Sequence, residues 1–462
     1  MTNRRYLYGI AGCIALAAAS LLVADEPVYD AWAWLVWGRE LTHLGLDATT
    51  GPSWKPLPVA LAAPLSLAGD AAPQLWLVLV RAAWLLSFVL AADLAYRLTA
   101  GRRHALRLLA AAFAALGLAL LSDDVTMWAR QAAGGMSEPL LVALVLGAVR
   151  VALAGRTRSA LALGALAALV RPEAWPLLAL YALWCWRADP RARPLVVIVA
   201  LGVPALWLAP ELLGSAGGGA ERAQRGTSDP LEALWRAAAL PLALSWPLAL
   251  LGLRDRAPRV LAAGTLAWLA VVAAMTAIGF PGLPRFMAPA AAIVCVLAGV
   301  GLAAGRPRPA TLVFVLAGLL VAAAGLPGRV SEPLHAWRSS ARISDSHDRL
   351  RTLARIVGSE RLLACGHLAT SDVLVRTALA WELDVPLSQV VSFGTRPRLS
   401  GTFVVGLQAS PGLREDVRDA ATLVAGVGEW QVYTIDCAAA ASAAAAASAS
   451  AASRAGVPSA TR

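Results

Sequence analysis

The sequence has few charged residues and almost no lysine. Charged side chains make up 15% of the 462 residues, whereas 58% of the residues are hydrophobic. A soluble domain carries about a quarter charged residues, so this composition excludes an ordinary soluble protein and indicates a chain built for a lipid bilayer. Lys55 is the only lysine, and arginine carries nearly all of the positive charge.

The sequence also lacks the patterns of several functional classes. It contains no metal-ligand cluster, no glycine-rich phosphate loop and no Ser-His-Asp arrangement, and its five histidines are isolated. The net charge of +11 does not indicate a nucleic-acid partner, because no basic stretch is interleaved with aromatic residues. We therefore predict no nucleic-acid partner and no definite cofactor, and we interpret the positive charge as a signal of membrane topology.

Apolar windows of about 17 to 25 residues, long enough to cross a bilayer, recur along the first two thirds of the chain. They lie at 5–24, 75–97, 105–122, 137–154, 194–210, 232–253, 259–280, 285–304 and 309–326. The region 158–186 adds two short helices hinged at Arg171-Pro172-Glu173. We predict about eleven transmembrane helices. The first helix is expected to stay uncleaved. Leu22 would lie three residues before the cut, where a signal peptide needs a small residue.

Arginine clusters alternate between successive apolar windows, as cytoplasmic loops require. They comprise Arg4 and Arg5; Arg102, Arg103 and Arg107; Arg156 and Arg158; Arg187, Arg191 and Arg193; Arg254, Arg256 and Arg259; and Arg306 and Arg308. This alternation predicts a multi-pass protein of the plasma (inner) membrane with a cytoplasmic N-terminus. An odd number of spans places the chain after the last span outside the cell membrane.

The composition becomes that of a soluble domain after residue 328. Helical patterns near 343–357, 371–382 and 413–425 alternate with apolar strands at 361–365, 401–407 and 430–435. We predict an all-α polytopic membrane domain over 1–328 and a small α/β extracytoplasmic C-terminal domain over 329–437. The Ala/Ser-rich tail, 438–462, is predicted to be disordered.

Two cysteines, Cys365 and Cys437, end two of the predicted strands. An extracytoplasmic compartment permits a disulfide between them. The pattern favours neither a disulfide nor two free thiols.

The long loop over 25–74 is the most informative segment, because most other loops are short. It opens with Asp25 and Glu26, followed by Tyr29 and Asp30. Carboxylates next to the hydrocarbon region need a cation, a metal or a substrate hydroxyl as a partner. The alternative is that the acidic pair only marks the helix end and caps the next helix.

Two apolar stretches follow within the same loop. The first carries Trp32, Trp34 and Trp37, and the second opens with Trp54-Lys55-Pro56-Leu57-Pro58. Tryptophan is favoured at the boundary between lipid and water. We therefore expect both stretches to form helices lying in the membrane interface.

These motifs resemble those of the GT-C superfamily of membrane glycosyltransferases, most closely its aminoarabinose-transferase and protein O-mannosyltransferase-like branch. Asp25, Glu26 and Tyr29 match an Asp-Glu-x-x-Tyr motif at the end of the first helix. Lys55, Pro56 and Leu57 resemble a Lys-Pro-Pro-Leu motif, from which this chain departs with Lys-Pro-Leu-Pro.

Three later motifs extend the resemblance over most of residues 5–326. Ser137-Glu138-Pro139-Leu140 is similar to the entry to the fourth helix, and Leu169-Val170-Arg171-Pro172 to a Leu-x-Arg-Pro turn. Pro284-Arg285-Phe286 is similar to the entry to a late helix. Each motif is short, and the most specific ones lie in the loop 25–74.

The resemblance implies an inverting glycosyltransferase that uses a polyprenyl-phosphate sugar on the outer membrane face. Its acceptor would be a cell-envelope glycan, lipid or protein. An acceptor hydroxyl must lose its proton during attack, and Asp25 is the first candidate for the base, with Glu26 and Asp30 as alternatives.

The leaving phosphate gains negative charge, which cations stabilise. Lys55, Arg171 and Arg285 are the candidates for this task. The two arginines have the alternative role of reaching the lipid headgroups.

Four other residues are further candidates. Tyr29 belongs to the opening motif. Asp123 and Asp124 have three alternative roles: they orient the acceptor, they hold a divalent ion, or they are solvated loop charges. Glu138 either joins the site or interacts with the N-terminal dipole of its helix.

Two other classes of function stay open. A lipid-linked sugar flippase or transporter also needs many spans and intramembrane charge, although such proteins commonly contain internal repeats that this sequence does not show. A non-catalytic subunit that binds envelope glycans through the outer domain is the third alternative.

Overall fold

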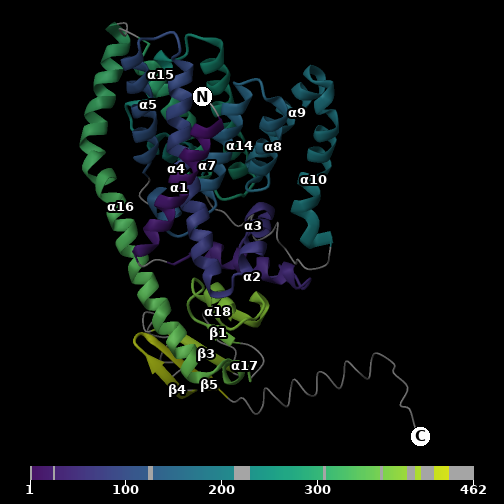
Figure 1. The fold of residues 1–462 in the computed structure, drawn as a ribbon. Coiled ribbons are helices and arrows are strands. Elements are labelled where there is room, and N and C mark those ends of the chain that lie inside the picture. Colours follow the sequence, from purple (N-terminus) through teal and green to yellow (C-terminus); the bar gives the residue numbers. More distant parts are fainter. Residues whose placement is uncertain are drawn as a thin grey trace.

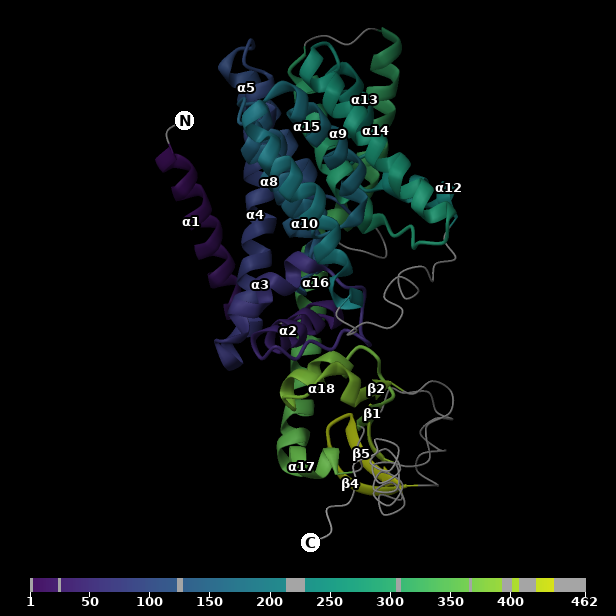
Figure 2. The same ribbon diagram turned by 90° about the vertical axis from the view of Figure 1, so that its right-hand side faces the viewer.

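A bundle of helices forms one end of the molecule and a small mixed domain forms the other (Figures 1 and 2). The computed structural model describes residues 3–23, 26–122, 128–212, 229–304, 309–364, 368–392, 401–406 and 421–435. Helices α2 (Tyr29–Thr42) and α3 (Pro56–Ser66) lie crosswise between the two ends. This arrangement confirms the predicted fold class of a polytopic helical membrane domain with a small α/β C-terminal domain.

Every predicted apolar window contains at least one helix. The helices are α1 (Asn3–Ala19), α4 (Ala72–Leu98), α5 (His104–Ala119), α7 (Glu138–Ala152), α8 (Thr157–Ala168), α9 (Trp175–Ala188), α10 (Arg193–Leu212), α12 (Pro230–Ala239), α13 (Ser245–Leu251), α14 (Arg256–Ala277), α15 (Ala288–Leu302) and α16 (Pro309–Val357). Length and composition allow five of the described helical segments to cross a membrane alone, namely 69–98, 190–211, 256–277, 284–302 and 312–357.

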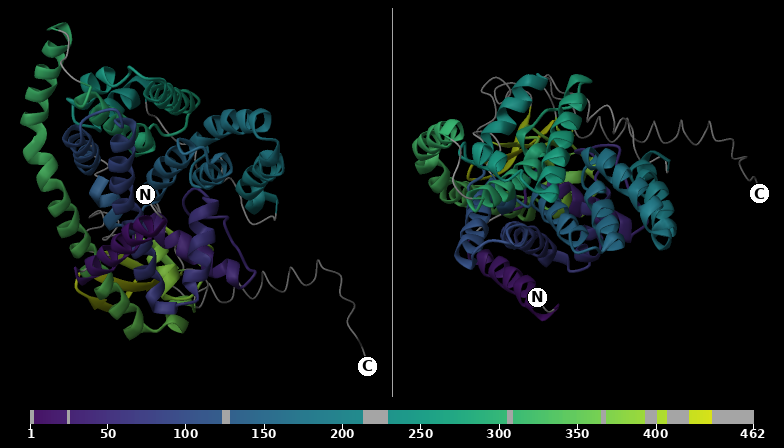
Figure 3. Two further views of the ribbon diagram at one scale, coloured as in Figure 1. Left: turned by 45° about the horizontal axis from the view of Figure 1, so that its top comes forward. Right: turned by 90° about the horizontal axis from the view of Figure 1, so that it is seen from above.

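Large apolar side chains are exposed on the outside of the bundle. Leu201 of α10, Leu266 of α14 and Phe314 of α16 are each about two thirds exposed. An apolar surface of this kind is typical of contact with lipid. Helix α1 lies at the rim of the bundle when the molecule is seen from above, and α16 runs along one edge (Figure 3).

Helix α15 lies at the centre of the bundle and is rich in alanine and glycine. Its apolar window is 89% buried. A side chain at Gly299 or Gly301 would collide with the backbone oxygen of Ala110 in α5 or Leu248 in α13. Small residues allow helices to approach closely where no hydrophobic effect drives them together, so α15 is the axis on which its neighbours pack.

The sequence correctly predicts one break between helices and misses another. A short 3-10 turn, η3 (Pro172–Ala174), separates α8 from α9, as expected. The single span predicted over 232–253 is wrong, because α12 and α13 are separate helices around Pro241. Arg329 of α16 donates hydrogen bonds of 2.6 to 3.3 Å to the carbonyls of Ala239, Leu240 and Pro241 at this break.

The outer loop forms the two predicted helices, but their surroundings differ from the expectation. Trp32, Trp34 and Trp37 of α2 are fully buried in protein and do not face lipid headgroups. Helix α18 (Arg376–Glu382) of the C-terminal domain, called the outer domain below, covers Trp32, and its Trp381 ring lies 6.1 Å from that of Trp32. Trp34 packs against Trp76 of α4, and Trp37 packs against Trp54.

The outer domain contains a five-stranded mixed sheet in the order β2-β1-β3-β5-β4. Its strands are β1 (Leu368–Thr370), β2 (Val390–Ser392), β3 (Gly401–Gly406), β4 (Thr422–Val427) and β5 (Trp430–Ile435). Strand β1 is parallel to β2 and β3, whereas β5 is antiparallel to β3 and β4. Strands β3 and β5 confirm the predictions at 401–407 and 430–435.

Two element predictions in this domain are wrong. The strand predicted at 361–365 is instead the end of helix α17 (Ser359–Leu363), and the first strand begins at Leu368. The last residues of the helix predicted over 413–425 belong to strand β4, whose partner β5 supplies the backbone hydrogen bonds. Cys365, Cys437 and the tail 438–462 lie outside the described residues.

Helix α16 joins the two ends of the molecule without interruption. Its 49 residues run through position 328, where the composition changes. Arg39 of α2 adds a second connection, because its guanidinium donates to the carbonyls of Ala380, Trp381 and Val385 at 3.0 to 3.2 Å. The outer domain is therefore fixed to the bundle by a continuous helix and by the buried interface of α2 with α18.

Candidate functional site

Charged residues from four distant segments meet at the outer end of the bundle. Lys55 precedes α3, Glu138 begins α7, Arg171 lies between α8 and α9, and Arg285 lies in the turn η5 (Pro284–Met287) before α15. We call these four residues together with Glu173 the charged cluster. Each of the first four was a candidate from the sequence, and the fold brings them together.

Glu138 is the centre of this cluster. Its side chain is fully buried, and its Oε1 atom lies 3.2 Å from Nη1 of Arg171 and 3.6 Å from Nε of Arg285. Arg171 also forms two hydrogen bonds with Glu173, of 2.7 and 3.1 Å. Arg171 and Arg285 repel each other, and burial strengthens this repulsion. The negative charge of Glu138 offsets it.

Lys55 is held by polar and aromatic neighbours. Its Nζ donates to Oγ of Ser137 at 2.9 Å and lies 4.8 Å from the ring centroid of Trp34. Burial lowers the pKa of Lys55 to about 8, although the carboxylate of Glu138 opposes this shift. Lys55 therefore loses its charge at a lower pH than an exposed lysine does.

Phe286 supports the two arginines of the charged cluster. The guanidinium of Arg171 lies 3.4 Å from the centroid of its ring, and that of Arg285 lies 5.6 Å away. Arg285 Nε makes no hydrogen bond to any described residue, and its side chain is 25% exposed. The Nε atom is itself buried against Glu138, so only the exposed part of the Arg285 side chain is available to an anion.

Four of the five residues of the charged cluster, all except Glu138, line a cavity of about 240 Å³, which we call the inner cavity. Asp30, Lys55, Arg171, Glu173 and Arg285 contribute to its wall. A larger outer cavity, of about 760 Å³, lies between the bundle and the outer domain. Asp30 and Arg285 line both cavities, so the two spaces adjoin at these residues.

The outer cavity has a polar wall of mixed charge. Arg130 of α6 (Trp128–Ala133) and Arg342 and Arg349 of α16 supply positive charge. Asp345, Asp372 and Glu429 supply negative charge, and Trp430 adds an aromatic surface. Such a wall suits a polar ligand with several hydrogen-bonding groups.

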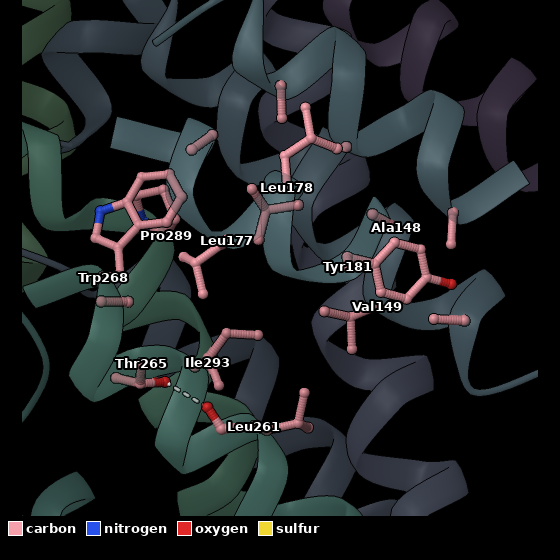
Figure 4. Close-up of a pocket in the computed structure, with 18 of the residues that line it drawn as sticks. Ala148, Val149, Leu177, Leu178, Tyr181, Leu261, Thr265, Trp268, Pro289 and Ile293 are labelled. Carbon is pink, nitrogen blue, oxygen red and sulfur yellow. Dashed lines mark hydrogen bonds between the residues drawn. The ribbon is translucent and has the colours of Figure 1, made fainter. Parts of the chain in front are cut away.

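A third cavity, of about 290 Å³, is almost wholly apolar (Figure 4). It lies between α7, α8, α9, α14 and α15, with Ala148, Leu177, Tyr181 and Ile293 among its lining residues. Trp268 of this apolar cavity donates to the carbonyl of Phe286 at 2.9 Å. The apolar cavity therefore adjoins the charged cluster through Phe286.

The remaining sequence candidates are placed differently. Glu26 is 5% exposed and forms an ion pair of 2.6 Å with Arg351 of α16, and Tyr29 lines the outer cavity. Asp25, Asp123 and Asp124 lie outside the described residues. Among the described residues, no group of three His, Cys, Asp or Glu side chains is placed to hold a metal ion.

Several residues of the site were not singled out from the sequence. Glu173 and Ser137 lie inside the quoted motifs, so their proximity to Arg171 and Glu138 was the available signal. Arg351 carried no signal, because it lies in an ordinary amphipathic pattern more than three hundred residues from Glu26. Its role follows only from the tertiary contact.

The fold is that of a polytopic helical membrane protein with a small α/β C-terminal domain, and it is similar to the fold of solved GT-C structures, as the sequence motifs indicated. Two solved structures similar to this chain are those of ArnT, a GT-C aminoarabinose transferase, from Cupriavidus metallidurans. The structure bound to undecaprenyl phosphate has a TM-score of 0.55 and 14% identity, and covers 94% of this chain and 98% of ArnT.

The structure of ArnT in the apo state has a TM-score of 0.56 and 14% identity, and covers 93% of this chain and 98% of ArnT. No protein-family model matches this chain, and no curated protein matches it. The similarity to ArnT is one of fold.

Replacing Glu138 with glutamine is expected to destabilise the protein by on the order of 3 kcal/mol, because Lys55, Arg171 and Arg285 lose the buried carboxylate that they share. Thermal unfolding of the purified variant in detergent would measure the loss. Glu232→Gln is the matched control, because Glu232 pairs with Arg236 at 2.7 Å on an exposed helix surface. That control should change stability by less than about 1 kcal/mol, and equal unfolding temperatures of the two variants would contradict the role given to Glu138.

Proposed function

We propose that this protein is an inverting glycosyltransferase that moves a sugar from a polyprenyl-phosphate donor to a cell-envelope acceptor on the outer face of the plasma membrane. The observation that carries the proposal is the convergence of Lys55, Arg171 and Arg285 on a cavity at the outer end of a GT-C fold. In this proposal the N-terminus is cytoplasmic and the C-terminal domain is extracytoplasmic.

The inner cavity is the proposed site of the donor phosphate and sugar. Bond breakage at the anomeric carbon leaves the electron pair on the phosphate oxygen, and nearby cations stabilise that charge. Arg285 lines both cavities with a partly exposed side chain, whereas Lys55 supplies a compact ammonium group. Undecaprenyl phosphate in the related ArnT structure supports a lipid of this class.

The apolar cavity is the proposed site of the donor's polyprenyl chain. A hydrocarbon chain there would extend from the charged cluster at Phe286, along α9 and α14, into the bilayer. Each methylene group removed from water contributes about 0.8 kcal/mol. The chain would therefore supply binding energy while the phosphate stays among the cations.

The outer cavity is the proposed site of the acceptor. It opens between the bundle and the outer domain, and it meets the inner cavity at Asp30 and Arg285. A hydroxyl entering from this side would attack the anomeric carbon from the face opposite the phosphate. One such displacement inverts the configuration of the sugar, and the proton passes to a carboxylate.

Asp25 and Asp30 are the proposed bases. Asp25 matches the first acid of the opening motif, and Asp30 lies on the wall that both cavities share. Glu26 is less suited, because its carboxylate is buried against Arg351. A carboxylate at the junction of two polar cavities favours transfer chemistry over a flippase, which needs no base.

The first expected outcome is sugar transfer by the purified protein in lipid, supplied with radiolabelled polyprenyl-phosphate sugars and a cell-envelope extract. Loss of the base typically costs 10²- to 10⁴-fold, so Asp30→Asn or Asp25→Asn should lower the transfer rate by about this factor. Asp70→Asn is the control, because Asp70 is an exposed acid of the same outer loop. Movement of the lipid across the bilayer without transfer would instead support the flippase.

The transfer rate should also depend on the charge of Lys55. Because its pKa is about 8, the ammonium is present below this pH and lost above it. The kcat/KM for the donor, which reports groups of the free enzyme, should fall as the pH rises through about 8. Arginine stays charged at this pH, so Lys55→Arg should lack this fall. An unchanged fall in the variant would assign it to another group.

Filling the apolar cavity should affect only donors with long chains. Ala148→Phe places an aromatic ring among the residues that line this cavity. We expect a KM about tenfold higher, equivalent to about 1.4 kcal/mol, for an undecaprenyl donor and an unchanged KM for a two-isoprene donor. Leu266→Phe on the lipid-facing side of α14 is the control. Equal effects on both donors would rule out this cavity as the tail site.

A further inference from the structure

Arg351 of α16 connects three segments of the chain through ion pairs. Its Nη2 lies 2.6 Å from Oε1 of Glu26, and its Nε lies 2.7 Å from Oε1 of Glu382 in α18. Its Nη1 lies 2.9 Å from Oδ1 of Asp348 on its own helix. Every nitrogen of the guanidinium group is thus directed at a carboxylate.

Glu26 is the buried member of this arrangement. Its side chain is 5% exposed, and it lines neither the inner nor the outer cavity. A carboxylate removed from water in this way needs a cation, and the removal of either partner is costly. The nearby His347 has its Nδ1 3.9 Å from Oε2 of Glu26, which is too far for a hydrogen bond.

The short segment from Glu26 to Asp30 is fixed at successive residues. The backbone N–H of Val28 donates to the carbonyl of Gly134 at 2.9 Å. The hydroxyl of Thr377 in α18 donates to the carbonyl of Tyr29 at 3.0 Å. Asp30 follows directly and lies where the two cavities meet.

The outer domain therefore holds this segment at two points, Glu26 and Tyr29, and the bundle holds it at Val28 between them. Val28 lies so close to Gly134 that a side chain at Gly134 would collide with it. Little freedom is left to the carboxylate of Asp30 unless one of these contacts is released.

We propose that Arg351 is a positioning residue for the transfer reaction: it holds Glu26 and thereby sets the place of Asp30, the proposed base at the end of this segment. This inference rests on the proposed function. Glu26 then positions the base and does not itself accept the proton. The outer domain contributes to catalysis through Arg351, in addition to lining the acceptor cavity.

Arg351 can be replaced without detaching the outer domain. Arg39 binds the C-terminal end of α18 through three carbonyls and an ion pair of 2.9 Å with Asp384. Trp32 of α2 packs against Trp381 of the same domain. A variant at Arg351 is therefore expected to fold, whereas Arg39→Ala provides a comparison in which docking itself is weakened.

The test is the steady-state kinetics of Arg351→Gln, Glu26→Gln and the double variant in lipid. A displacement of about 1 Å at a reacting group can cost 10²-fold, so each single variant should lower kcat by about 10- to 100-fold. The KM for the polyprenyl-phosphate donor should stay within about twofold of the wild type, because the charged cluster is untouched. The double variant should be no slower than the slower single variant.

Arg355→Gln is the matched control, because Arg355 is an exposed arginine one turn further along α16. It should leave kcat and KM unchanged. Hydrogen exchange gives a second readout: the amides of Glu26 and of residues 28–30 should exchange faster in Arg351→Gln, while those of α18 keep the wild-type rate. In Arg39→Ala the amides of α18 should exchange faster as well.

Three results would overturn the inference. These are full kcat in a folded Arg351→Gln variant, independent and additive losses in the double variant, or a raised donor KM with unchanged kcat. Each of them leaves the proposed function intact, because the wild type still transfers sugar. A wild-type protein that transfers no sugar from any donor would instead overturn the proposed function and this inference together.

Discussion

The site depends on the burial of several like charges around one carboxylate. Lys55, Arg171 and Arg285 come from three separate segments, and each would repel the others in a region without water. Glu138, fully buried at the start of α7, contacts both arginines, while Ser137 beside it binds Lys55. This pairing fixes the relative positions of α3, α7, η3 and η5. The cavities at the outer end of the bundle have their shape because these segments cannot move apart without exposing an uncompensated charge.

The bundle supplies a rigid support for that site. Helix α15 packs closely because Gly299 and Gly301 leave room for the backbones of α5 and α13. Arg329 of α16 satisfies the carbonyls at the break between α12 and α13, which would otherwise be costly in an apolar medium. The same helix α16 then continues into the outer domain and carries Arg351. One helix thus links the packing of the bundle to the segment that holds Glu26.

The outer domain is more than an attachment to the membrane domain. It covers Trp32 of α2, forms one side of the outer cavity and contacts the segment between Glu26 and Asp30. Polar ligands could reach the junction at Asp30 from this side, while the apolar cavity approaches the charged cluster from the side of the bilayer. In the proposed reaction, the two substrates would therefore meet between a membrane domain and a soluble domain, each contributing charged groups.

The sequence by itself determined the membrane class, the positions of most helices and the break at Arg171 to Glu173, and it offered four of the five residues of the charged cluster as candidates. Apolar length and short motifs are local signals, and they do not depend on which segments later become neighbours. Only the tertiary structure decided that Trp32, Trp34 and Trp37 face protein, that Pro241 divides a predicted span and that residues near 361 are helical. It also decided that Glu26 pairs with Arg351. Burial and ion pairing depend on contacts between distant segments, which hydropathy along the chain does not predict.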